Sequence, residues 1–258
     1  MLKKLFLLWV FQHEVILDRR SYSWPFQFTL PKHLPPSLAP KKTLYPYVRY
    51  YICVIFDEPW YKPNAKHIYP LLVFPRVNLL HIHSSHEIVP FLYLNRKNLQ
   101  LNGHLLRGGI IPGENILIYI NIKNPKQCHI KQFQIILIQH CQIAQSHHEE
   151  IIFEIDVPGL HNFNQTNFEQ TFNLLVPSLH VPPTYKFMAH SNHQIYPVIV
   201  TYQLDLKAKL HGMLTGFDVK VPLIIGTELG SDPQPIDAHM ITYDQPPPAY
   251  ETVVSNTI

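Results

Sequence analysis

The stretch ENILIYINIKN (114–124) decides the fold class. Isoleucine occupies every second position from 116 to 122, and a leucine, a tyrosine, an asparagine and a lysine fill the positions that follow each of them. Residues two apart share one face of a strand, so the pattern predicts a strand with one buried and one solvated face. TYQLDLKAKL (201–210) alternates in the same way, with the leucines and Ala208 facing inward and Asp205, Lys207 and Lys209 facing water.

The rest of the chain repeats this pattern in short segments. Turn signals such as RGGIIPGE (107–114) and DVPGLHN (156–162) separate them. About ten strands without helical periodicity predict an all-β fold of antiparallel β-sandwiches. The further candidate strands are SWPFQFTL (23–30), YVRYYICVIF (47–56), KHIYPLLVF (66–74), FLYLNRKNLQL (91–101), IKQFQIILIQH (130–140), EEIIFEIDV (149–157), TFNLLV (171–176) and VKVPLIIG (219–226).

An internal repeat organises these strands. Val48 opens VRYYICVIF 21 residues before Tyr69, and Val200 opens VTYQLDLKA 21 residues before Val221 (69 − 48 and 221 − 200). A Pro-Pro pair precedes each unit, at 35–36 and 182–183. We therefore expect two related sandwiches in tandem, each containing a strand, a Pro-Pro turn, a strand, a loop and a strand, and meeting near residues 76–90.

Composition and charge narrow the class of protein. Hydrophobic residues make up 46% of the chain, which is ample for a packed core. The net charge of +3 is mild, and the basic residues form no dense block, so nucleic-acid binding is not expected. The three cysteines, Cys53, Cys128 and Cys141, lie in apolar runs without a CxxC motif. Free buried thiols in a reducing compartment fit this pattern best.

The N-terminus leaves two interpretations open. Lys3 and Lys4 precede the apolar run 5–11, as in a signal peptide, but no small-residue cleavage site follows. The run is shorter than the roughly 20 residues that span a bilayer. We favour a core strand or an atypical start over a secreted β-sandwich protein.

Two copies of Pro-Pro-x-Tyr occur in the chain, at 182–185 and 247–250. Consecutive prolines pre-form a polyproline II helix, which docks into the aromatic groove of a WW domain with little loss of entropy. Residues 230–258 hold five prolines, four acidic residues and no Lys or Arg, which predicts a disordered tail. We expect Pro247, Pro248 and Tyr250 to bind a WW domain. Pro182–Tyr185 occupies the repeated turn, so we expect it to be structural.

Other chemistry is weakly indicated. The end of the chain, SNTI, carries Asn256 where PDZ ligands commonly have Ser or Thr. His81, His83 and His86 are close in sequence, but zinc needs three or four converging ligands and no partner cluster accompanies them. We expect them in an inter-lobe loop. No phosphate-binding loop, HExxH or Gly-x-Ser-x-Gly occurs, so we expect no metal, no cofactor and no catalysis.

The order of these motifs resembles the arrestin-domain family, specifically its alpha-arrestin branch. The resemblance rests on WPFQFTLPKHLPPSL (24–38), YVRYYICVIFDEPW (47–60), GGIIPGENILIYINIKN (108–124), VPLIIGTELG (221–230) and the tail PPPAY (246–250). It implies two tandem arrestin-type immunoglobulin-like β-sandwiches. About twenty residues precede SYSWPF, where roughly 80 to 100 more would complete a first lobe, so we expect that lobe to be incomplete. The expected divisions are an atypical segment 1–19, a partial amino-terminal lobe 20–78, a carboxy-terminal lobe 88–228 and a tail 229–258.

The resemblance implies an adaptor rather than an enzyme. The lobes would engage the cytoplasmic part of a membrane cargo protein, and the tail would hold a WW-containing HECT-type ubiquitin ligase. The cargo would then enter ubiquitin-dependent endocytosis and transport, with the adaptor cytoplasmic and recruited peripherally to the plasma membrane or endosomes. The alternative within the same fold is a trafficking scaffold, like the arrestin-like subunit of retromer, without ligase recruitment.

Overall fold

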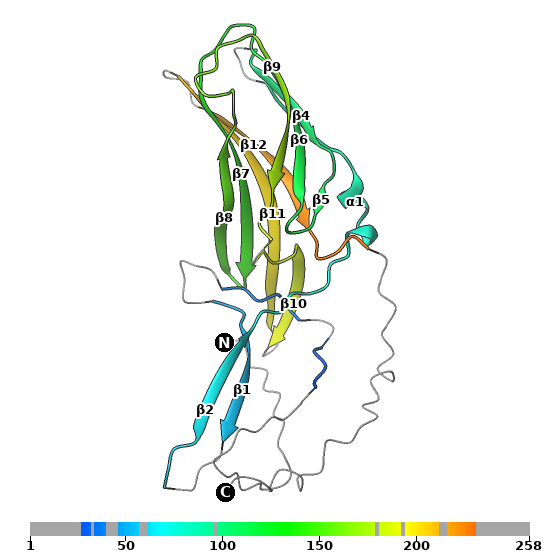
Figure 1. Ribbon diagram of the computed structural model, residues 1–258, viewed down its shortest axis with the longest axis vertical. Coiled ribbons are helices and arrows are strands. Elements are labelled where there is room, and N and C mark those ends of the chain that lie inside the picture. Colours follow the sequence, from blue (N-terminus) through cyan, green and yellow to red (C-terminus); the bar gives the residue numbers. More distant parts are fainter. Residues whose placement is uncertain are drawn as a thin grey trace, which may run out of the picture.

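A computed structural model describes residues 27–31, 34–39, 46–56, 61–94, 98–178, 181–191, 194–211 and 216–230. Within them the chain is almost entirely β-structure, as the alternation predicted (Figure 1). No helix in these ranges is long and apolar enough to cross a membrane. The expected N-terminal segment 1–19 and the tail beyond residue 230 lie outside the described residues.

The second lobe is a sandwich of two sheets. Its smaller sheet is antiparallel, in the order β3-β4-β6-β9. Its larger sheet has the order β5-β12-β11-β7-β8, and β10 also pairs with β11. The strands of the smaller sheet are β3 (Val89–Leu94), β4 (Gln100–Leu105), β6 (Asn115–Lys123) and β9 (Asn167–Leu175). Those of the larger sheet are β5 (Gly109–Ile110), β7 (Ile130–Ile143), β8 (Ser146–Asp156), β10 (Tyr185–Ser191), β11 (Gln194–Leu210) and β12 (Phe217–Ile225).

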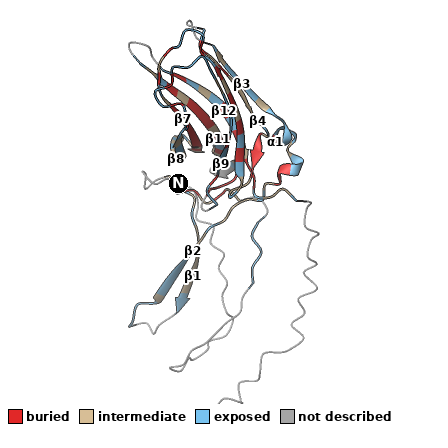
Figure 2. Cartoon of the chain, turned by 45° about the horizontal axis from the view of Figure 1, so that its top comes forward, coloured by how far each residue is buried: buried red, intermediate tan, exposed pale blue. Residues whose placement is uncertain are grey.

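The core lies between these two sheets. Ile118, Ile120 and Ile122 of β6 are fully buried, and Leu204 and Leu206 of β11 face them from the other sheet, also fully buried. Figure 2 shows buried residues, in red, along strands of this sandwich. The alternation read from 114–124 and 201–210 is therefore confirmed on the inward side of each strand.

The prediction that the outward face of β11 is solvated is wrong at Asp205. Asp205 is 2% exposed although it points away from the core. Its polar partners lie on its own strand: the Gln203 amide donates a hydrogen bond to Oδ1, and Lys207 Nζ lies 3.5 Å from Oδ2. A buried carboxylate is tolerated where such polar partners satisfy it, which period-two alternation cannot reveal.

The described part of the first lobe contains one hairpin, β1 (Tyr50–Phe56) and β2 (Ala65–Leu71). Its register matches that of β11 and β12 residue for residue. Tyr50 pairs with Leu71 as Tyr202 pairs with Leu223, and the offset holds over all seven pairs. The internal repeat is thus confirmed at the level of strand pairing. The hairpin projects from the end of the sandwich near β10 (Figure 1).

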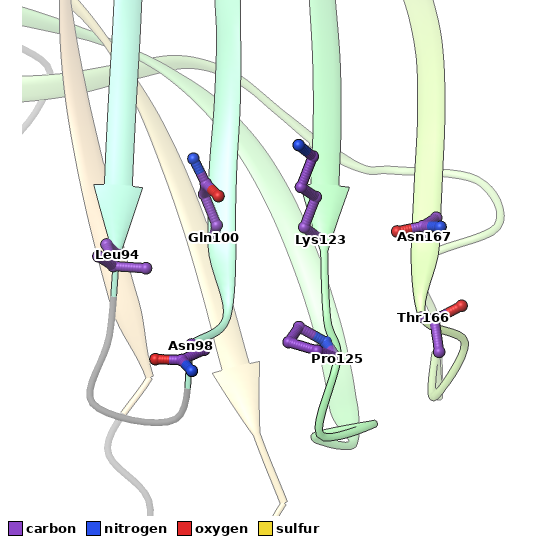
Figure 3. Close-up of a pocket in the computed structure, with 7 residues that line it drawn as sticks. All are labelled: Leu94, Asn98, Gln100, Lys123, Pro125, Thr166 and Asn167. Atoms are coloured by element: carbon purple, nitrogen blue, oxygen red, sulfur yellow. The ribbon is translucent and has the colours of Figure 1, made fainter.

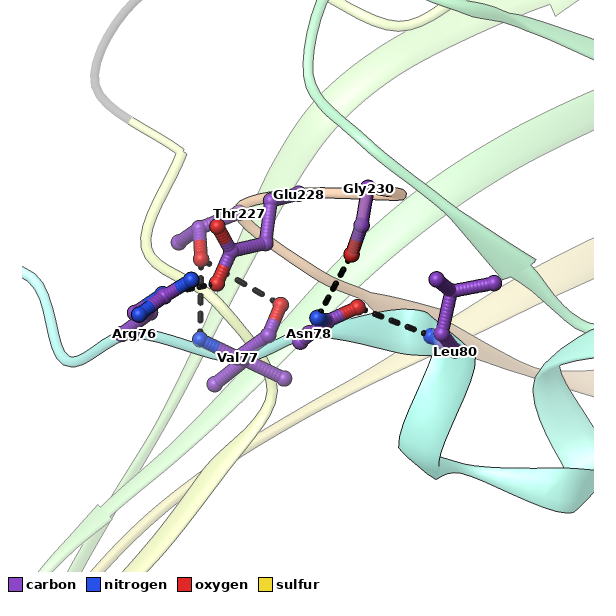
Figure 4. A network of polar contacts seen from close by, with 7 residues as sticks. All are labelled: Arg76, Val77, Asn78, Leu80, Thr227, Glu228 and Gly230. Carbon is purple, nitrogen blue, oxygen red and sulfur yellow. Dashed lines mark hydrogen bonds and ion pairs between the residues drawn. The ribbon is translucent and has the colours of Figure 1, made fainter. Parts of the chain in front are cut away.

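The segment leaving the first lobe is joined to the segment that follows β12 (Figure 4). Thr227 N donates to Val77 O at 2.8 Å, Val77 N donates to Thr227 Oγ1 at 2.8 Å, and Leu79 N donates to Glu228 O at 3.0 Å. Arg76 and Glu228 form an ion pair. These contacts, together with the short helices η1 (Leu79–His81) and α1 (His83–His86), hold the chain between the lobes against the second sandwich.

Three expectations about strands need correction. FLYLNRKNLQL is two strands, because Asn98 has a φ of +59° and Leu94 pairs back with Gln100; asparagine tolerates this left-handed conformation. The strand expected at 23–30 is absent from its described part, 27–30. Strand β10, directly after the second Pro-Pro pair, was not predicted.

Candidate functional site

The two Pro-Pro-x-Tyr copies are the candidate partner-binding sites. The terminal copy, with Pro247, Pro248 and Tyr250, lies outside the described residues. The internal copy, 182–185, is described. It joins the segment after β9 to β10.

Pro182 and Pro183 are both buried. The hydroxyl of Tyr202 donates a buried hydrogen bond to the carbonyl oxygen of Pro182. A WW domain needs the ridge of both prolines and the tyrosine ring at the surface. The expectation that this copy is a structural turn is therefore confirmed, because its ridge is already inside the protein.

The residue after the prolines fastens this turn to the last residue of β12. Thr184 N donates to Ile225 O at 2.7 Å, and Ile225 N donates to Thr184 Oγ1 at 2.9 Å. These two hydrogen bonds satisfy the backbone N–H and C=O of Ile225 at the end of β12, where hydrogen bonds to a neighbouring strand no longer satisfy them. A hydroxyl at position 184 is thus used structurally.

The first repeat has the same fastening. Ser37 N donates to Val73 O at 2.8 Å, and Val73 N donates to Ser37 Oγ at 2.8 Å. The Tyr50 hydroxyl donates to Pro35 O at 2.7 Å. Both Pro-Pro-hydroxyl turns are therefore one structural device used twice. The sequence signal for it was the shared Pro-Pro-Ser/Thr, which marked the turn but not its bonds.

The tyrosines of these turns stay protonated at neutral pH. Burial, and then the neighbouring Tyr185, raises the pKa of Tyr50 to about 12. Burial, followed by Cys141 and Glu150, raises the pKa of Tyr202 far above its usual range. These hydroxyls are hydrogen-bond donors and do not act as bases.

The histidines of 81–86 do not converge. His83 lies 3.2 Å from Glu87 with its side chain 95% exposed, while a His86 ring nitrogen is 3.1 Å from Leu79 O. They lie on the segment between the lobes, in η1 and α1 rather than in the loop expected there. Across the described ranges, no group of three or more His, Cys, Asp or Glu is arranged to hold a metal.

A shallow hollow of about 550 Å³ lies at one end of the smaller sheet (Figure 3). Gln100, Lys123 and Asn167 line it from adjacent strands, joined by Leu94, Asn98, Pro125 and Thr166. A smaller one, of about 190 Å³, lies over β7 and β8 beside His140 and Glu149. The first offers amides and one cation, without a carboxylate pair or an activated nucleophile among its lining residues, so it is not arranged for acid–base or covalent catalysis.

The described residues form one β-sandwich and one hairpin of the other repeat, each with a matching Pro-Pro turn. The family model of the arrestin (or S-antigen) C-terminal domain matches residues 95–229, just over half of the chain. The arrestin (or S-antigen) N-terminal domain model matches residues 9–80. The chain belongs to the arrestin family, whose members are adaptors that bind partner proteins. No curated protein matches the chain.

Proposed function

We propose that this protein is an adaptor of the alpha-arrestin kind, which brings membrane cargo to a WW-domain HECT-type ubiquitin ligase. Pro247, Pro248 and Tyr250 bind the ligase, and the lobes bind the cytoplasmic part of the cargo. The cargo, marked with ubiquitin, then enters endocytosis and transport. In this proposal the adaptor does not catalyse ubiquitin transfer; it raises the local concentration of the ligase near the cargo.

The difference between the two Pro-Pro-x-Tyr copies is the observation that carries this proposal. The internal copy has a structural role, since its prolines are buried and its third residue, Thr184, is hydrogen-bonded to Ile225. The terminal copy follows Pro246, which lengthens the proline ridge, in a stretch without Lys or Arg. Within an arrestin-family chain, the terminal copy is therefore the one whose sequence suits docking.

Affinity of one such peptide is expected to be modest. Short docking peptides bind at about micromolar strength, near −8 kcal/mol. Recruitment then depends on a second contact, such as a shared membrane surface or several WW domains on one ligase. This favours a peripheral, reversible assembly at the plasma membrane or endosomes.

Titration of the full-length chain with an isolated WW domain tests the proposal. Tyr250→Ala removes the ring that fills the second pocket and should abolish measurable binding. Tyr185→Ala, in the buried copy, is the matched control and should leave the affinity unchanged while a thermal melt verifies folding. Binding that survives Tyr250→Ala would contradict the proposal and favour a scaffold without ligase recruitment.

A further inference from the structure

We draw no further inference here: the strongest candidate, the hollow of about 550 Å³ that Gln100, Lys123 and Asn167 line at one end of the smaller sheet, is bordered by residues 95–97, which lie outside the described residues, so nothing in the structure shows what its complete rim would bind.

Discussion

The hydroxyl of Tyr202, in the middle of the longest strand, donates a buried hydrogen bond to the backbone carbonyl of Pro182. Proline brings no N–H of its own, but its carbonyl still needs a donor when it is buried. Tyr202 supplies that donor from inside the sandwich. The bond fixes a Pro-Pro pair whose sequence alone matches a docking motif.

Tyr50 and Pro35 repeat this relationship in the first lobe, at a distance of 2.7 Å. The tyrosine stands two residues after the valine that opens each repeat, Val48 or Val200. A Pro-Pro pair that precedes a Val-x-Tyr strand is therefore explained by the fold. For the copy at 247–250 we propose binding instead.

Removing the Tyr202 hydroxyl should destabilise the protein. Tyr202→Phe keeps the ring but leaves the buried Pro182 carbonyl without its donor, at a cost of about 1–3 kcal/mol in the free energy of unfolding. Tyr50→Phe should cost less, because Tyr50 is only half-buried and water can reach its partner. Urea denaturation measures both variants, and a Tyr202→Phe loss smaller than that of Tyr50→Phe would refute this account.

Gly226 is required by the contact between the lobes. A Cβ at this position would lie 2.5 Å from Leu79 Cγ and 3.0 Å from Val77 O, so one segment must shift. Gly226→Ala should reduce the free energy of unfolding by about 1–3 kcal/mol, the usual cost of overpacking. Gly230→Ala is the matched control, since nothing lies within 4 Å of its Cβ position. Equal melting temperatures for the two variants would count against a tight contact here.

Stability should fall at alkaline pH. The pKa of Tyr50 is about 12 in the folded protein and about 10 when unfolded, and burial shifts the pKa of Tyr202 in the same direction. Above pH 10 the unfolded chain therefore binds fewer protons than the folded one, and the free energy of unfolding declines as pH rises. Denaturation midpoints between pH 8 and pH 12 measure this. The decline should be smaller in Tyr202→Phe, where Tyr50 still titrates with a raised pKa, and a flat profile in the unsubstituted protein would contradict the prediction.

Strand alternation and the 21-residue spacing were enough to predict the sandwich class, the inward faces of β6 and β11 and the repeat that relates the two hairpins; their register came from the structure. These features depend on local periodicity, which a sequence displays directly. The structural part of Pro182–Tyr185 was also predicted, because the repeat gave the motif a counterpart at Pro35–Pro36.

The features that the sequence did not predict depend on contacts that hydrophobic periodicity does not encode. Asp205 is buried and accepts a hydrogen bond from the Gln203 amide, although its position belongs to the outward face. The hairpin between β3 and β4 depends on the left-handed Asn98, hidden within an apparently continuous strand. The bonds of Thr184 with Ile225 join residues 41 apart, so the fastening of the turn became visible in three dimensions alone.

Phosphorylation of Tyr250 should switch off ligase binding. At pH 7 a phosphotyrosine carries close to two negative charges, and the WW pocket for the tyrosine is apolar, so docking must strip water from a dianion. Asp244 and Glu251 nearby add no compensating cation. Calorimetric titration of a peptide spanning 240–258, with and without the phosphate, should show at least about a tenfold loss of affinity for a WW domain. Equal affinities would mean that the Tyr250 ring does not enter an apolar pocket that excludes water. The prolines alone would then have to account for WW-domain binding.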